Sequence, residues 1–192
     1  MCEVVNGVSK EHKEVTENML YPEFKGLLYG IVNGINLDHW QLKEFRELVG
    51  KEYNKDNVVR IFEMHRKAKE RFARFIKETN GIDLDLNKVF VVEARRKTNF
   101  KSVDTFIQAM KNKELREKFL KTDVIQIFLG KQHYTDRWGY ARVKEIMALM
   151  EGRIVELDES TLEEKVIEID ERLKGRIIFI PNFNSVEAPI IF

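Results

Sequence analysis

Four short apolar runs in the second half of the chain constrain the fold more than any other feature of the sequence. They are VFVVEA (89–94), VIQIFLG (124–130), RIVELD (153–158) and RIIFIP (176–181), and each contains several β-branched residues. Runs of this kind are typical of strands that are buried on both faces. APIIF at the end of the chain could add a fifth strand.

Helical patterns separate these runs, at 102–121, at about 137–150 and at 160–173. Strands that alternate with helices favour a parallel sheet with right-handed crossovers and helices on both faces. The sequence therefore predicts an α/β fold, in which a three-layer α/β C-terminal region holds a mainly parallel sheet of four to five strands.

The first part of the chain reads differently, because apolar residues recur there at three- and four-residue steps between residues 10 and 80. The clearest amphipathic helix covers residues 57–78, with one apolar face and one basic face. We expect two regions, a helical region at 1–85 and the α/β region at 86–192, packed against each other.

Composition excludes several classes of protein. A hydrophobic content of 43% in 192 residues is enough for a continuous core, so disorder is not expected. No apolar run approaches the roughly 20 residues that span a bilayer, so we expect no membrane contact. The single cysteine, Cys2, favours a reducing compartment and a cytoplasmic location. The high Glu, Lys and Arg content is also typical of thermophile proteins.

Candidate site residues follow the predicted strands, because ligands of open parallel sheets bind beyond the carboxyl ends of the strands. Three side chains there could serve as acid, base or metal ligand: Glu93, His133 and Asp158. Cations that could hold phosphate oxygens are Arg95, Arg96, Lys97, Lys131 and Arg137. Tyr134 and Trp138 could stack on bases. This pattern points to a phosphate-bearing ligand.

A second basic surface is expected on the helix at 57–78. From Arg60 to Lys77 the chain has seven Lys or Arg and two Glu, whereas from Glu151 to Arg172 it has nine acids and three bases. Lys67, Arg71 and Arg74 could follow a phosphate backbone. Together with the strand-end cations they could form one continuous track for nucleic acid.

Three local patterns resemble known families. Asp85, Glu93 and Arg95 resemble the metal-binding acids and the cation of PD-(D/E)xK nucleases, with arginine in place of the usual lysine. Arg60 and His65 have the spacing of the catalytic motif of HEPN-type ribonucleases. WGYARVKEIMALMEGRIVELDE is similar to a helix and strand of glutaredoxins, although Arg137-Trp138-Gly139-Tyr140 replaces the redox cysteines, and it implies a thioredoxin-like sheet as an alternative.

These observations lead to three hypotheses from different classes. The first is a protein that binds or processes nucleic acid, with a divalent metal if it is a nuclease. The second is an enzyme that acts on a nucleotide or small phosphorylated substrate at the strand ends. The third is an interaction protein that assembles through complementary charged faces. Walker A and GxGxxG loops are absent from the sequence. We therefore do not expect phosphate binding by a glycine-rich loop of either type.

Overall fold

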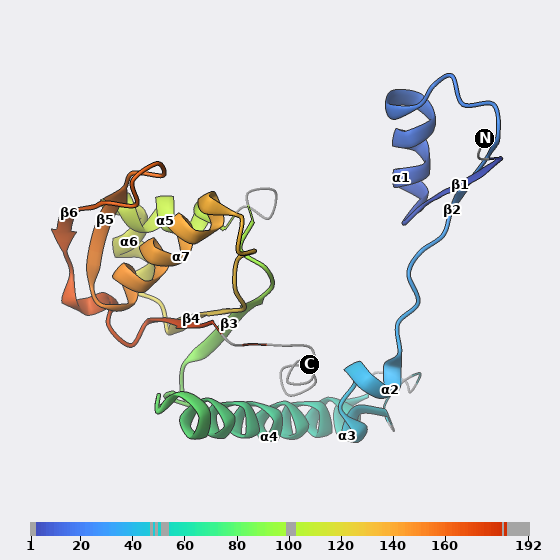
Figure 1. The fold of residues 1–192 in the computed structure, drawn as a ribbon. Helices are drawn as coiled ribbons and strands as arrows, with labels where there is room; N and C mark the ends of the chain where they lie inside the picture. Colours follow the sequence, from blue (N-terminus) through green and yellow to red (C-terminus); the bar gives the residue numbers. More distant parts are fainter. Residues whose placement is uncertain are drawn as a thin grey trace. The chain divides into compact units, whose positions relative to one another are not determined.

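The computed structural model describes residues 3–46, 48, 50, 54–98, 103–181 and 183. The chain divides into two units, residues 1–41 and residues 42–192. Figure 1 shows the elements of each unit. The fold is mixed α/β, with a parallel sheet in each unit. The division predicted from the sequence, 1–85 and 86–192, stays a prediction.

The first unit is a β-α-β arrangement. Strands β1 (Val4–Gly7) and β2 (Leu27–Gly30) pair in parallel, with Val4 opposite Leu27 and Gly7 opposite Gly30. Between them lie α1 (Lys10–Val15) and a π-helical turn at Thr16–Leu20, and α2 (Leu37–Trp40) ends the unit. The sequence pattern predicted only helices in this part, which is wrong for the two strands. Each strand has four residues, and such short runs show little alternation.

The second unit is organised around a three-stranded parallel sheet. Its strands are β3 (Val89–Ala94), β4 (Val124–Leu129) and β7 (Ile177–Ile180), and β4 lies between the other two. All three strands were predicted within one or two residues from their β-branched apolar runs. The mixed α/β character and the parallel sheet are therefore confirmed, while the three layers and a total of four to five strands stay predictions.

Helices contribute to two apolar clusters, and successive residues of β4 alternate between them because strand side chains point to opposite faces. In the first cluster, Phe128 packs with residues of α5 (Asp104–Lys111) and α7 (Arg137–Met150). In the second, Ile127 packs with Phe72 and Ile76 of α4 (Lys55–Asn80). The remaining helices of the unit are α3 (Lys43–Arg46) and α6 (Lys113–Leu120). Figure 1 shows α4 along one side of β3 and β4 and the helices α5, α6 and α7 on the opposite side.

The long helix α4 contains the amphipathic segment predicted at 57–78 and extends it by two residues at each end. Asn54 caps its start by accepting a hydrogen bond from the backbone N–H of Asn57 at 2.9 Å. Gly81 ends the helix in the left-handed conformation, with φ of 69°. Only the later part of its apolar stripe packs on the sheet: Phe72 and Ile76 are buried, whereas Phe62 is 70% exposed.

The region from 153 to 173 is where the predicted fold is wrong. Strand β5 (Arg153–Leu157) pairs antiparallel with β6 (Glu164–Ile169) and does not join the three parallel strands. The helix predicted at 160–173 is absent: β6 and a single 3-10 turn at Glu171–Leu173 occupy it. The reversal happens at Leu162, whose φ is 62°, so no helix can run through this position. The fifth strand predicted at APIIF lies outside the described residues.

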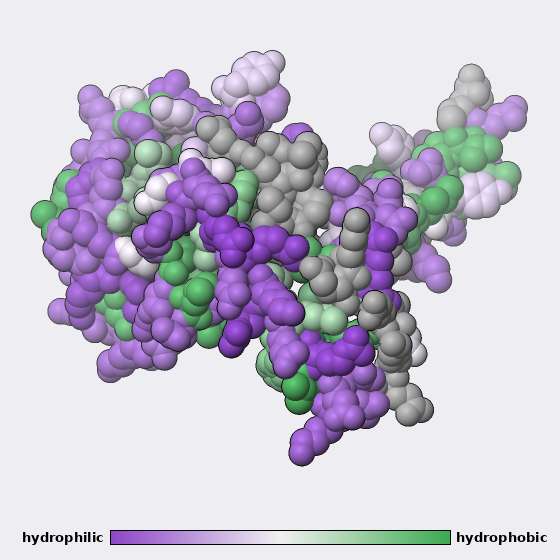
Figure 2. All heavy atoms as spheres, turned by 90° about the horizontal axis from the view of Figure 1, so that it is seen from below, coloured by the Kyte–Doolittle hydropathy of each residue, from purple (hydrophilic) through white to green (hydrophobic). Residues whose placement is uncertain are grey.

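Among the helices that the structure describes, none combines the length and the apolar character needed to cross a membrane. Figure 2 shows hydrophilic side chains over most of the visible surface of the second unit.

Candidate functional site

The carboxyl ends of β3 and β4 continue into two loops that run side by side. The backbone N–H of Arg95 donates to the carbonyl of Leu129 at 3.2 Å, and that of Lys97 donates to the carbonyl of Lys131 at 3.3 Å. Gly130 allows this approach: its φ is 97°, and a Cβ there would lie 2.8 Å from the carbonyl oxygen of Arg95. The two loops therefore present their side chains next to each other.

The start of α7 packs against the same pair of loops. Asp136 caps the helix by accepting a hydrogen bond from the backbone N–H of Gly139 at 2.8 Å. A Cβ on Gly139 would overlap the carbonyl oxygen of Lys97 and lie 3.0 Å from Cβ of Gln132. Glycine at this position thus lets the helix start touch both loops.

Glu93, near the end of β3, forms ion pairs with two of the predicted phosphate ligands. Its Oε1 lies 3.1 Å from Nε of Arg95 and 2.9 Å from Nζ of Lys97. Burial alone raises the pKa of Glu93, but the hydrogen bonds from both cations outweigh burial and the pKa is lowered. Glu93 is therefore ionised at neutral pH, where it accepts hydrogen bonds and cannot donate a proton.

Lys97 is not available to a ligand, because its side chain is fully buried. Its ammonium group lies against Glu93 and 5.1 Å from the ring centroid of Phe128. Burial lowers the pKa of Lys97, and the Glu93 carboxylate offsets part of that effect. The role that this geometry supports for Lys97 is to fix the loop after β3.

Arg96 and Lys131 are different, because both are exposed and neither has an ion pair or side-chain hydrogen bond within the described part of the chain. The strand register sets Ala94 opposite Leu129. Two residues further along, the same register brings Arg96 opposite Lys131, and the bond from Lys97 N–H to the Lys131 carbonyl is consistent with it. Two uncompensated positive charges therefore stand on neighbouring loops at the strand ends.

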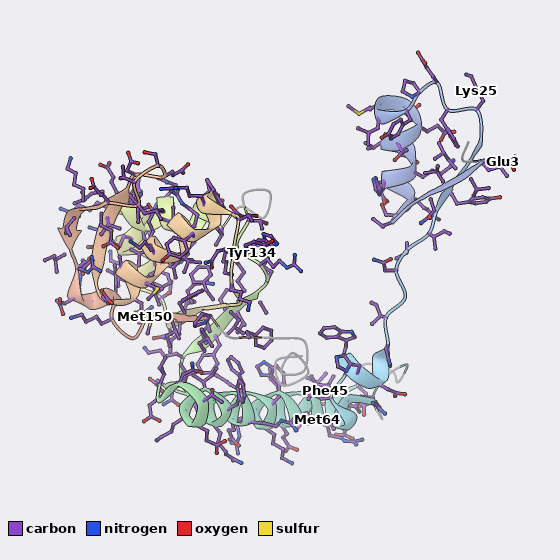
Figure 3. All side chains as sticks on the ribbon, viewed as in Figure 1. Glu3, Lys25, Phe45, Met64, Tyr134 and Met150 are labelled. Carbon is purple, nitrogen blue, oxygen red and sulfur yellow. The ribbon has the colours of Figure 1, made fainter. Side chains whose placement is uncertain are left out.

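His133 and Tyr134 follow Lys131 in the same loop. Nδ1 of His133 lies 2.7 Å from Oγ1 of Thr135 and accepts a hydrogen bond from the Thr135 N–H at 3.3 Å. With Nδ1 accepting, the proton of the neutral ring is on Nε2, which can donate to an anion. The Tyr134 ring is 91% exposed and lies 4.4 Å from the His133 ring. Figure 3 shows Tyr134 on the outside of the unit, well separated from Met150 at the end of α7.

Arg137 and Trp138 have other partners. Nε of Arg137 donates to the Glu159 carbonyl at 2.8 Å, and its Nη2 donates to the Ser160 carbonyl. Trp138 is half-buried against the apolar cluster of α5 and α7, with the Arg142 guanidinium 5.4 Å from its ring. The structure thus ties Arg137 to the turn after β5 and Trp138 to the core, so both residues have structural roles here.

Asp158 lies in the turn between β5 and β6, outside the parallel sheet. Its Oδ1 accepts hydrogen bonds from Oγ of Ser160 at 2.6 Å, from N–H of Ser160 at 2.7 Å and from N–H of Thr161 at 2.8 Å. These bonds, with that from the Ser160 hydroxyl first, lower the pKa of Asp158 to about 2. The residue that was expected to act in catalysis therefore shapes a turn, because its strand belongs to the hairpin.

The low pKa of Asp158 predicts how the stability of the turn depends on pH. The folded chain holds this carboxyl below its usual pKa of 3.8, so its contribution is complete above pH 3.8 and is lost as the pH falls through about 2. We expect the Asp158→Asn variant to unfold at a lower temperature than the wild type at pH 5. The difference should become much smaller as the pH falls to about 2, as measured by circular dichroism. An equal difference at both pH values would contradict this account.

The three cations of α4 are not brought to the strand ends. Lys67, Arg71 and Arg74 are exposed, and the side of α4 that carries Phe72 and Ile76 packs against the sheet. The loops after β3 and β4 extend from the ends of the strands. The continuous track predicted from the sequence stays a prediction, because part of the basic cluster after β3 lies outside the described residues.

The nuclease-like patterns predicted metal-binding acids, and the described residues form no metal site. Among the described residues, no group of three or more His, Cys, Asp or Glu is placed to hold a metal ion. Asp85 accepts a hydrogen bond from the N–H of Asn87 at 2.9 Å, which is a local turn contact. His65 of the ribonuclease-like pattern lies on the exposed side of α4.

One buried charge cluster was missed by the sequence analysis. Glu145 of α7 is almost fully buried and lies 2.7 Å from Nζ of Lys111 and 2.9 Å from Nε of Arg142. The three side chains line a cavity of about 560 Å³ beside the β5–β6 hairpin. No sequence signal links Lys111 to Glu145, because 34 residues separate them. Arg142 also lies 3.1 Å from Glu159, so two cations are paired with two carboxylates here.

No family model matches the chain. The chain is similar to a glycogen phosphorylase from Aquifex aeolicus (strain VF5), with 23% identity over 226 residues. The similarity covers 98% of this chain and 30% of the phosphorylase, so the chain spans less than a third of the length of that curated relative. With 98% of the chain included, the similarity extends over both units and over the strand ends that carry the candidate site.

Proposed function

We propose that the chain binds a small phosphate-bearing ligand at the carboxyl ends of β3 and β4, as part of an enzyme that acts on a phosphorylated small substrate. The observation that carries this proposal is the pair Arg96 and Lys131, two exposed cations on adjacent loops without a carboxylate partner among the described residues. The name of the curated relative, glycogen phosphorylase, supports it, because a phosphorylase takes phosphate as a reactant.

In this proposal Arg96 and Lys131 hold the phosphate oxygens directly. Arginine offers two parallel N–H donors and lysine a compact charge, and both suit phosphate. His133 can add a donor from Nε2, and it stays the candidate for acid or base chemistry. Glu93 acts indirectly, since it holds Arg95 and Lys97 in place at 3.1 and 2.9 Å.

The test is a titration of the full chain with inorganic phosphate, followed by calorimetry and by amide chemical shifts. We expect Arg96→Ala and Lys131→Ala each to weaken binding about tenfold, which is the effect of losing one charged hydrogen bond. Lys113→Ala is the matched control. Lys113 is exposed on α6, so this substitution removes one positive charge away from the proposed site. Equal losses in all three variants would show a general charge effect and would contradict a site.

Nucleic-acid binding is the second candidate, and the exposed row Lys67, Arg71 and Arg74 on α4 favours it. Binding of this kind falls steeply with salt. Fluorescence anisotropy with short DNA and RNA at two salt concentrations tests it, with and without a divalent metal for a nuclease. We expect Arg71→Glu and Arg74→Glu to weaken nucleic-acid binding and to leave phosphate binding unchanged. Binding that resists both reversals would reject α4 as the contact.

Other sequence-based expectations also stay proposals. They are the cytoplasmic location, the origin in a thermophile, the four- to five-stranded sheet in three layers, and assembly through complementary charged faces. The acidic stretch from Glu151 to Arg172 would supply one of those faces.

A further inference from the structure

The ring of His133 is held by the residue two positions further along the same loop. Oγ1 of Thr135 lies 2.7 Å from Nδ1 of His133, and the backbone N–H of Thr135 donates to the same nitrogen at 3.3 Å. A backbone N–H can only donate, so Nδ1 is the accepting nitrogen of the ring. The Thr135 hydroxyl therefore donates as well, and two donors of one residue converge on Nδ1.

The backbone fixes the place of Thr135 beside the ring. The N–H of Asp136 donates to the carbonyl of His133 at 2.9 Å and closes a turn that contains Thr135. Asp136 also caps α7 by accepting from the N–H of Gly139 at 2.8 Å, so the turn is attached to the start of a helix of 14 residues. The contact between Thr135 and the His133 ring thus belongs to the connection between β4 and α7.

The two hydrogen bonds decide what the other ring nitrogen can do. A neutral imidazole carries one N–H, and which nitrogen holds it is set by the hydrogen bond of the other nitrogen. Because Nδ1 of His133 accepts, the proton is on Nε2, at the opposite side of the ring from Thr135. A protonated Nε2 donates a hydrogen bond and cannot take up a proton. His133 is therefore built as a donor.

We propose that Thr135 is a positioning residue of the phosphate site: it keeps the proton of His133 on Nε2, so that His133 donates a hydrogen bond to the ligand and does not act as a base. This inference rests on the proposed function, because it needs the ligand at Arg96 and Lys131. A histidine that acts as a base in a catalytic triad carries its proton on Nδ1, where a carboxylate accepts it. At His133 a donor stands in that place, which is the opposite arrangement.

The other groups of the site are donors too. Lys131 lies two residues before His133, and the strand register brings Arg96 opposite Lys131. Among the described residues, no carboxylate forms an ion pair with His133, and the ring nearest to it is that of Tyr134 at 4.4 Å. With Nε2–H donating, His133 adds a third donor for the phosphate oxygens without adding a charge.

The test combines calorimetry with inorganic phosphate and the nitrogen chemical shifts of the His133 ring, which distinguish a protonated nitrogen from a bare one. At about pH 8.5, where imidazoles are neutral, we expect the proton on Nε2 in the wild type. Thr135→Val should weaken phosphate binding about threefold, because without the hydroxyl part of the rings carry the proton on Nδ1. Thr135→Ser should bind as the wild type does. Thr79→Val is the matched control, since it removes an exposed hydroxyl at the end of α4.

The pH dependence separates this role from a merely structural one. At about pH 5 imidazoles are protonated and carry an N–H on both nitrogens, so the tautomer no longer matters. Thr135→Val should then bind phosphate as the wild type does at that pH. A loss of the same size at both pH values would overturn the inference, because it would show that Thr135 only shapes the loop.

Replacing His133 itself gives a second measurement. His133→Gln identifies the ring signals by their disappearance, and its amide N–H can take the place of the Nε2 donor, so it should retain most of the phosphate affinity. His133→Ala should lose about threefold at about pH 8.5. Binding that depends on Arg96 but not on His133 or Thr135, or a wild-type ring with its proton on Nδ1, would overturn this inference alone. A wild-type chain that binds no phosphate would overturn the proposed function as well.

Discussion

Replacing Arg116 with methionine is expected to lower the free energy of unfolding by about 3 kcal/mol, because it breaks a buried ion pair and removes the donor that three acceptors share. The Arg116 side chain is 1% exposed, and its Nε donates to Asp170 at 3.1 Å. It also donates to Glu168 at 2.5 Å and to the Met110 carbonyl at 2.9 Å. One side chain thus joins α6 to the end of α5 and to β6. Urea denaturation monitored by circular dichroism measures the change.

The control for this experiment is Lys118→Ala, which removes a cation from the same helix. Lys118 pairs with Glu114 on the surface, with 67% and 77% of the two side chains exposed. Pairs of this kind contribute little, so the expected loss is below about 0.5 kcal/mol. If Arg116→Met costs no more than Lys118→Ala, the buried network does not stabilise the fold.

Replacing Gly139 with alanine should cost about 2 to 3 kcal/mol of stability and also weaken phosphate binding. The added Cβ would overlap the Lys97 carbonyl oxygen, which is backbone and cannot rotate away. The loop cannot shift easily either, because Lys97 N–H is bonded to Lys131 and its Nζ to Glu93. Any adjustment must therefore move Arg96 and Lys131 relative to each other. Calorimetry with inorganic phosphate and thermal unfolding report the two effects.

Gly34→Ala is the matched substitution, since a Cβ on Gly34 meets no atom within 4 Å. We expect this variant to unfold and to bind phosphate as the wild type does. A loss of affinity without a loss of stability in Gly139→Ala would also fit the proposed site. Unchanged phosphate affinity together with lowered stability would instead show that the start of α7 does not contribute to ligand binding.

The elements that the sequence predicted well are those whose own periodicity decides their structure. The strands at 89–94, 124–129 and 177–180 are β-branched runs, and in the structure β4 and β7 are buried along almost their whole length. The helix α4 has 26 residues, long enough for its apolar stripe to be unambiguous. Burial in the core follows directly from such patterns.

The β5–β6 hairpin could not be read in the same way. Leu162, Val166, Ile169 and Leu173 have helical spacing, and Ser160 with Glu163 has the spacing of a helix cap. The competing interaction is that of Asp158, which takes the N–H groups of Ser160 and Thr161 for a turn. All six residues of β6 are exposed. The strand therefore has no alternation of buried and exposed side chains that its sequence pattern could have shown.

For the candidate site, the sequence predicted which loops carry the cations but not which of these cations are paired with carboxylates. Glu93, Arg95 and Lys97 are at alternate positions of an extended segment, so their side chains point to the same side and pair. That spacing was visible in the sequence and could have identified Arg95 and Lys97 as ion-pair partners of Glu93. The hydrogen bonds of Arg137 to the turn after β5 could not be foreseen, because they depend on the hairpin.

The central position of β4 has a consequence for how the second unit opens. Its backbone is paired with β3 on one edge and with β7 on the other, and its last five residues are buried. Amide protons of such a strand have no local route to solvent, so they exchange with deuterium only when the whole unit unfolds. Their exchange rates in native buffer therefore report the global unfolding free energy directly.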